Sequence, residues 1–168
     1  PAGSSVGWGG AMSAQQIGLL DTVRTGDYHA LDRERAATPE ERKAIMKQCL
    51  GADVFITGAN ALSLDGQMVN IDGNGNRVAA IVYGPESVIV IAGMNKVMDS
   101  LDAAVERART VAAPQNKQRF DSKTPCEVTG ACADCKSDDC ICNQILITRN
   151  CNPPGRIKFI LVGEELGL

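Results

Sequence analysis

The sequence has little histidine, and this limits the chemistry that the chain can perform. His29 is its one histidine, so a metal site built from several imidazole rings is excluded. A Ser–His or Cys–His nucleophile pair would have to use this residue, which lies in a polar, turn-rich stretch between residues 26 and 39. The sequence therefore assigns no catalytic residue.

Long apolar runs and a targeting signal are also missing. No run approaches the roughly eighteen apolar residues that span a bilayer. The opening PAGSSVGWGG has neither the basic nor the apolar region of a signal peptide. We expect a cytoplasmic protein without membrane contact.

No charge of one sign dominates. The 17 basic and 20 acidic residues are interspersed, with a formal net charge of -3, whereas nucleic-acid-binding proteins concentrate basic residues on one stripe or block. No nucleic-acid partner is expected, and small molecules or proteins are favoured. The 168 residues suit one domain, residues 1–168.

The sequence does contain a regular alternation of strand and helix patterns. Alternation of this kind predicts an α/β fold, a three-layer Rossmann-like mainly parallel sheet with a small cysteine-rich insertion near the C-terminus. We expect strands near Val6, Phe55 and Val90 at its centre, extended by the strand of Ile147 or Ile160. The predicted strands are near Val6 and at 52–56, 87–93, 144–148 and 156–162, and the predicted helices are 13–26, 39–49 and 97–112.

Local signals predict where these helices begin. Ser13 and Gln16 match a capping box, and Thr38 before Pro39 matches an N-cap followed by proline in the first turn. Residues 114–125 are polar and predict a connector.

The stretch from Thr57 to Ala80 is dense in glycine and asparagine and follows a buried strand pattern. Asp65-Gly66 predicts a hairpin turn, and residues 72–77 predict a loop whose N–H groups can hold an anion ahead of a helix. The loop lacks both the Walker motif and the dinucleotide fingerprint, and an ordinary structural turn is an equal alternative. We expect a small anionic ligand, with Arg77 as its main charge partner, at Gly9, Gly10, Ser13, Thr57, Gly58, Asn60, Asn74, Gly75, Asn76, Arg77 and Lys96.

Five of the seven cysteines lie between residues 126 and 142, which favours metal or redox chemistry over a secreted disulfide framework. Four thiolates suit zinc or an iron–sulfur cluster, but the spacing matches neither common motif. Bare or disulfide-linked thiols are the alternative. The predicted ligands are Cys126, Cys132, Cys135 and Cys142, with the roles of Cys140 and Cys151 left open.

The segments GADVFITGANALSLDGQMVNIDGNGNRVAA and GPESVIVIAGMNKV, with the C-x5-C-x2-C-x6-C spacing, resemble the cysteine-containing branch of the LUD (lactate-utilisation) domain family. This resemblance implies a fold like that of sugar-phosphate isomerases and CoA-transferases. It also implies a basic residue at position 140 in most members, and a helix and strand before Pro1 that this chain lacks. The missing element would expose a sheet edge, so a homo-oligomer is expected.

For function, the resemblance implies a subunit or accessory factor in lactate or related 2-hydroxy acid utilisation, with iron–sulfur or flavin protein partners. An independent enzyme acting on a small phosphorylated or carboxylated metabolite and a metal-stapled interaction module are the alternatives. Ribose-phosphate isomerases place a glutamate after the glycine-rich loop, where this chain has Val78-Ala79-Ala80. Aldose isomerisation is therefore disfavoured, because it needs a general base within reach.

Overall fold

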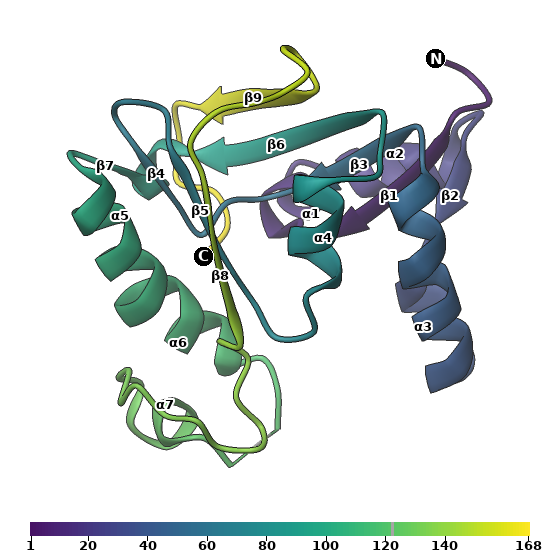
Figure 1. Ribbon diagram of the computed structural model, residues 1–168. Helices are drawn as coiled ribbons and strands as arrows, with labels where there is room; N and C mark the ends of the chain where they lie inside the picture. The colour runs from purple at the N-terminus through teal and green to yellow at the C-terminus, as the bar shows by residue number, and fades with distance from the viewer. Residues whose placement is uncertain (122) are drawn as a thin grey trace.

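The computed structural model describes residues 1–121 and 123–168, which form two sheets covered by helices (Figure 1). All five strands of the larger sheet are parallel, in the order β2-β1-β3-β6-β9. The smaller sheet has the order β7-β4-β5-β8. The strands are β1 (Ser5–Gly9), β2 (His29–Leu31), β3 (Val54–Thr57), β4 (Ala61–Ser63), β5 (Met68–Asp72), β6 (Ser87–Gly93), β7 (Val97–Met98), β8 (Gln144–Thr148) and β9 (Ile157–Val162).

The helices are short except for α3 and a continuous helical segment from residue 101 to 117. That segment consists of α5, a π-helical turn called η4, and α6. No helix of the described residues has the length and apolar content that a bilayer crossing requires. The helices are α1 (Met12–Gln16), α2 (Leu19–Thr25), η1 (Arg33–Arg35), α3 (Pro39–Gln48), η2 (Cys49–Gly51), α4 (Asn76–Val82), η3 (Met94–Lys96), α5 (Leu101–Arg107), η4 (Ala108–Ala112), α6 (Ala113–Lys117) and α7 (Pro125–Thr129).

The larger sheet is the middle of three layers, because successive strand residues point to opposite faces. Trp8 and Ile56 pack under α1 and α2, while Phe55 and Val88 belong to the core on the opposite face, under α4. Burying one such side chain contributes about 1.5–3 kcal/mol. The predicted α/β fold with a mainly parallel sheet is therefore confirmed.

The smaller sheet was not predicted. β5 pairs antiparallel with β4 through a turn at Gly66 (φ +87°), which confirms the predicted hairpin. β8 pairs antiparallel with β5, so the strand of Ile147 lies in this sheet and only the strand of Ile160 extends the parallel sheet. The sequence left the choice between these two strands open, because the partner of β8 lies more than seventy residues away in sequence.

Several predicted boundaries are also corrected. The helix expected over 13–26 is broken at Gly18, whose φ of +75° is left-handed. Ser13 lies inside α1 and makes no capping bond, so the capping box is wrong, whereas Thr38 caps α3 by accepting a bond from Glu41 N. His29 begins the edge strand β2.

Two further boundaries differ near the middle of the chain. The helix expected over 97–112 begins at Leu101 after the short strand β7. Residues 113–117 continue the helix through Pro114, where a connector was predicted. Both differences arise because the segment packs on the smaller sheet, whose existence the local pattern does not indicate.

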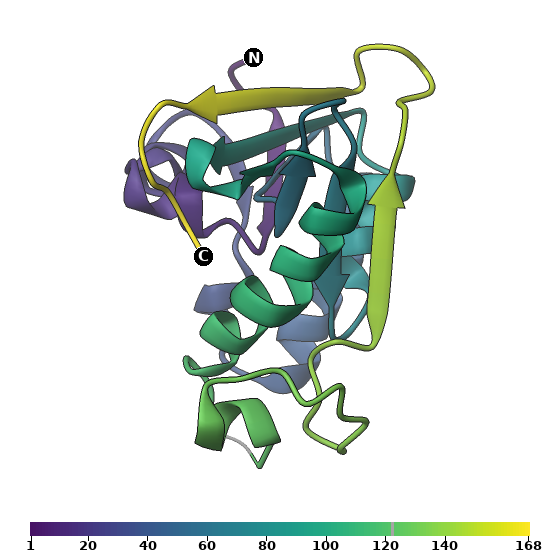
Figure 2. The same cartoon turned by 90° about the vertical axis from the view of Figure 1, so that its left-hand side faces the viewer.

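Strand β9 is an edge of the larger sheet (Figure 2). Its Phe159, Ile160 and Leu161 are 41–51% exposed. The homo-oligomer expected from the sequence stays a prediction.

The strand order places a topological switch point between β1 and β3. The connection after β1 leads to β2 on one side, and the next connection returns to β3 on the other side. Ligands of open α/β sheets bind in the crevice outside the carboxyl ends of the strands at such a point. In this chain, the crevice lies between the Gly10 turn after β1 and the segment from Gly58 to Asn60 after β3.

Candidate functional site

A cavity of about 580 Å³ opens at the carboxyl ends of the parallel strands. We call it the strand-end cavity. Its volume is within the range of small-molecule sites. Six of the residues predicted to bind ligand line it, namely Gly10, Asn60, Asn74, Asn76, Arg77 and Lys96.

The other five predicted residues lie behind the wall or beside it. Thr57 is fully buried and donates its hydroxyl to Gly9 O at 2.8 Å. Gly58 N donates to Gly10 O at 3.1 Å, Ser13 is buried beneath Lys96, and Gly75 precedes α4 in a left-handed conformation. These five residues were predicted to bind the ligand, but they are not part of the cavity lining.

Hydrogen bonds to Asn60, Ile71 and Asp72 hold Arg77 at the cavity wall. Its Nη2 donates to Asn60 Oδ1 at 2.8 Å and to Ile71 O, while its backbone N donates to Asp72 Oδ2 at 2.9 Å. Its Nη1 makes no hydrogen bond to the part of the chain that the structure describes and lies beside Gly10. A Cβ atom at Gly10 would approach Nη1 to 2.5 Å, so the guanidinium requires glycine at that position.

Lys96 is buried at the end of β6, with an exposed fraction of 3%. Its Nζ donates to Ala59 O at 3.1 Å and to Ser13 Oγ at 3.4 Å. Burial, with the charges of Arg107 and Arg77, lowers the pKa of Lys96 to about 8. Within residues 1–121 and 123–168, no carboxylate forms an ion pair with it.

Arg33, which the sequence reasoning missed, also lines the strand-end cavity. Its Nη1 lies 3.0 Å from the amide oxygen of Asn76 in the amide orientation that satisfies both groups. Its buried Nε finds no partner among the described residues. Burial and the neighbouring Arg42 lower the pKa of the Arg33 guanidinium.

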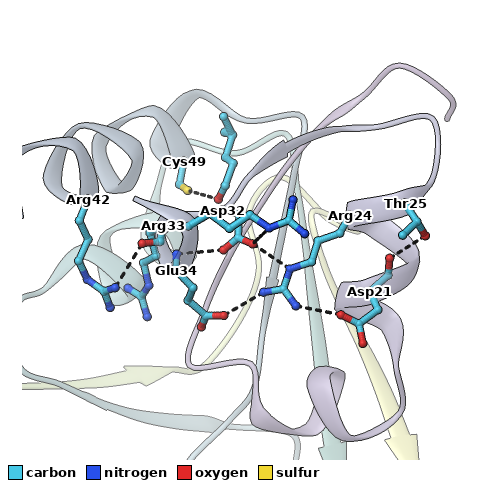
Figure 3. A network of polar contacts seen from close by, with 10 residues as sticks. Asp21, Arg24, Thr25, Asp32, Arg33, Glu34, Arg42 and Cys49 are labelled. Atoms are coloured by element: carbon cyan, nitrogen blue, oxygen red, sulfur yellow. Dashed lines mark hydrogen bonds and ion pairs between the residues drawn. The ribbon is translucent and has the colours of Figure 1, made fainter. Parts of the chain in front are cut away.

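A polar network positions the turn that carries Arg33 (Figure 3). Arg24 Nε donates to Asp32 Oδ2 at 2.8 Å, and its Nη atoms donate to Asp21 Oδ1 and Glu34 Oε2 at 3.0 and 2.9 Å. Asp32 Oδ1 also accepts from Glu34 N at 2.9 Å, which caps η1. The network therefore links α2 to the cavity wall.

Arg107 was also missed, because it lies within a helix with no motif around it. From α5, its Nε donates to Asn95 O at 3.1 Å and its Nη1 to Asn60 O at 2.5 Å. These two bonds tie together the segments that follow β3 and β6. Arg107 is therefore a positioning residue for Asn60 and Lys96.

A second, smaller cavity of about 120 Å³ lies in the cysteine-rich segment. We call it the thiol cavity. Its lining includes five cysteines from a segment of seventeen residues, Cys126, Cys132, Cys135, Cys140 and Cys142. Cys140 and Lys117 line both cavities, so the two sites share a wall.

The thiols of this segment lie close together but are not bonded. All seven cysteines of the chain are free. Burial, followed by the neighbouring thiols of Cys140, Cys132 and Cys126, raises the pKa of Cys142 to about 12, whereas a hydrogen bond with Ser137 lowers the pKa of Cys135. Among the residues that the structure describes, no three metal-ligating side chains form a ready-made metal site.

The fold and the cavity define an α/β protein with a polar, ligand-sized site at a topological switch point. The sequence model of the LUD domain matches residues 1–162. The chain belongs to the LUD domain family, whose name refers to lactate utilisation, and this confirms the predicted family.

Solved structures with similar folds include a DUF162 family protein from Deinococcus radiodurans, at 13% identity and a TM-score of 0.44, with 96% of this chain and 88% of that one covered. eIF2B beta from Chaetomium thermophilum has 16% identity and a TM-score of 0.38, with 61% and 40% covered. Ribose 5-phosphate isomerase A from Neisseria gonorrhoeae has 16% identity and a TM-score of 0.37, with 60% and 48% covered. The comparison with curated proteins gave no match.

Proposed function

We propose that this LUD-domain protein binds a small carboxylate or phosphorylated metabolite in the strand-end cavity, as a subunit or accessory factor of lactate or related 2-hydroxy acid utilisation. One observation carries the proposal. Arg33, Arg77 and Lys96 line the cavity, and within the described residues none of them forms an ion pair. Burial lowers the pKa of all three, so an anion between them would remove an electrostatic cost.

The geometry favours a small ligand with one charged end. Arg77 Nη1 and Arg33 Nε are donors left without a protein acceptor among the described residues, and guanidinium groups bind carboxylate and phosphate oxygens through paired hydrogen bonds. Asn74 and Asn76 add amide groups that suit hydroxyl or carbonyl oxygens. A 2-hydroxy or 2-oxo acid presents both kinds of oxygen on adjacent carbons.

We expect Arg33→Gln and Arg77→Lys each to weaken binding of the best anion by about tenfold or more, because each removes a charge-assisted or paired bond. Thermal-shift screening of lactate, pyruvate, acetate, inorganic phosphate and a sugar phosphate would select the ligand, and calorimetry would measure its Kd. Arg77→Lys is preferred to Arg77→Ala because the side chain also holds Asn60.

Lys43→Gln is the matched control, since Lys43 is an exposed lysine of α3 outside the cavity lining. It should change Kd by less than about twofold. Unchanged affinity in both cavity variants for every ligand found would contradict the proposed binding site.

The thiol cavity supports a second role, the binding of a zinc ion or an iron–sulfur cluster. The bound group would crosslink the cysteine-rich segment and would form an interaction site for a redox partner protein. The support is the gathering of five thiols around one small cavity, a donor set that suits soft metals. The ligands proposed from the sequence remain Cys126, Cys132, Cys135 and Cys142. Cys140 is a fifth thiol on the shared wall, and metal binding would need the thiols to move closer together than they lie here.

Serine at Cys132 and Cys135 together should abolish the metal content of protein purified without oxygen, because two of four thiolate ligands are lost. Metal analysis and the absorption spectrum are the measurements. Cys151→Ser is the control, since Cys151 lies outside the thiol cavity and bonds to Ile157 N and Pro153 O. Metal-free wild type, or equal metal in the double variant, would leave these cysteines as structural or redox thiols.

A further inference from the structure

Lys96 differs from an ordinary buried lysine in the groups that surround it. Its Nζ donates hydrogen bonds to the carbonyl of Ala59 and the hydroxyl of Ser13, and the charges of Arg107 and Arg77 lower its pKa further. A buried ammonium normally has a carboxylate partner, and in the described chain this one has none. Such surroundings favour the neutral amine, which is the nucleophilic form.

The Lys96 side chain also belongs to the wall of the strand-end cavity. Lys96 lines the strand-end cavity together with Gly10, Asn60 and Arg77. The C-terminal segment lies over it, because a Cβ atom at Gly167 would approach Nζ to 2.5 Å and Gly167 N donates to Gln16 Oε1 at 2.6 Å. Figure 2 shows this segment running from β9 toward α1. The C-terminal segment therefore covers Nζ, and the Lys96 side chain forms part of the cavity wall.

We infer that Lys96 forms an imine with the carbonyl carbon of a 2-oxo carboxylate bound in the strand-end cavity. The inference rests on the proposed function, since it assigns the anion of that site to a class that carries a reactive carbonyl. Arg77 Nη1 is the donor available for the carboxylate, and Lys96 Nζ is the nucleophile for the adjacent carbon.

The step balances without an oxidant or a reductant. The nitrogen lone pair forms the C–N bond, and one nitrogen proton passes to the carbonyl oxygen to give a carbinolamine. Loss of that hydroxyl with the second nitrogen proton releases one water and leaves the imine. The Ser13 hydroxyl, 3.4 Å from Nζ, is placed to relay a proton. An imine of this kind makes the bonds at the neighbouring carbons easier to break.

The pKa of Lys96 makes the reaction feasible near neutral pH. With a pKa of about 8, roughly a tenth of the Lys96 side chains are neutral at pH 7, roughly three hundred times the fraction for a lysine of ordinary pKa. The groups facing Nζ are Arg77 of α4, Arg107 of α5, the Ser13 hydroxyl and the Ala59 carbonyl. Trapping should therefore increase between pH 6.5 and 8.5.

The test is reduction of the imine with borohydride in the intact protein in the presence of pyruvate, followed by peptide mass mapping. The expected product carries the mass of pyruvate less one oxygen atom on Lys96. Lys117 is an internal control, because its exposed fraction is also 3% and it lines the same cavity. Its Nζ donates a hydrogen bond to Asp139 O at 2.7 Å. Acetone, a carbonyl without a carboxylate, should label Lys96 at least about tenfold less than pyruvate.

Lys96→Arg should remove the adduct, with circular dichroism confirming that the variant is folded. Wild-type mapping alone decides the question if the variant does not fold. Pyruvate binding detected by thermal shift without any Lys96 adduct would overturn the imine while leaving the proposed anion site standing. Labelling spread evenly over exposed lysines would also overturn the imine at Lys96. Absence of both pyruvate binding and adduct would overturn the imine and the proposed anion site together.

Discussion

Replacing Asp32 by alanine is expected to destabilise the protein by about 2 to 3 kcal/mol. The Asp32 side chain is only 5% exposed and holds Arg24, whose side chain is 14% exposed. Removing Asp32 takes away the buried partner of Arg24 and leaves it only the more exposed carboxylates of Asp21 and Glu34. The same change removes the bond from Glu34 N that caps η1, so Arg33 should lose its fixed position and the strand-end cavity should bind anions more weakly.

Asp21→Ala is the matched control for this prediction. Asp21 pairs with the same arginine, Arg24 at 3.0 Å, but its side chain is 74% exposed. Exposed pairs contribute about 0.2–1 kcal/mol, so denaturant unfolding should show a small loss and ligand affinity should be unchanged. Equal losses in the two variants would show that the network in Figure 3 does not depend on its buried carboxylate.

Replacing Lys96 by methionine is expected to stabilise the protein at pH 7. The folded pKa of Lys96 is lowered from 10.5 to about 8, so below pH 8 the folded protein keeps a buried charge at a cost of about 3 kcal/mol. Methionine has a similar size and no charge, but leaves Ala59 O without its donor, which removes about 1 kcal/mol of the gain. The expected net gain is about 2 kcal/mol.

The pH dependence identifies the cause of this gain. Between pH 8 and 10.5 the unfolded wild type binds more protons at this lysine than the folded protein does, so wild-type stability rises with pH across that window. The advantage of Lys96→Met should therefore be largest below pH 8 and should disappear as pH approaches 10.5. Chemical denaturation at several pH values measures it, and a pH-independent difference would mean that packing, not charge, causes it. A residue that reduces stability at neutral pH is understandable if its amine takes part in binding or chemistry.

Local signals predicted a large part of the fold. The Asp65-Gly66 turn, the Thr38 N-cap and the strand of β6 were all predicted correctly. Each depends on residues that are neighbours in sequence, since turn conformation, capping and strand periodicity are local properties. The rule for open α/β sheets requires only the order of strands and loops, and the loops at the strand ends do line a cavity.

Predictions from the sequence failed or stayed incomplete where contacts between distant segments determine the position of a residue. Ser13 has the sequence context of a helix cap, yet it is buried under Lys96, 83 residues later in the sequence. The pattern of β8 indicated a strand but not its sheet, which is set by antiparallel pairing with β5. Arg33 lies in a polar stretch without a motif, and its place at the cavity depends on an ion pair between α2 and the segment before η1.

The sequence by itself determined the α/β class, the glycine-rich loops and the clustering of thiols, because composition, periodicity and short motifs carry that information. Its resemblance to the LUD domain family was confirmed by the match to residues 1–162. Only the tertiary structure decided which polar residues share a cavity and which of them support it from behind. It also decided that Lys96 is buried and that no carboxylate of residues 1–121 or 123–168 pairs with it. The physical reason is that burial and charge pairing depend on which groups fold together in space. Residues such as Arg33, Arg77 and Lys96 acquire their chemistry from neighbours that are far from them in the chain.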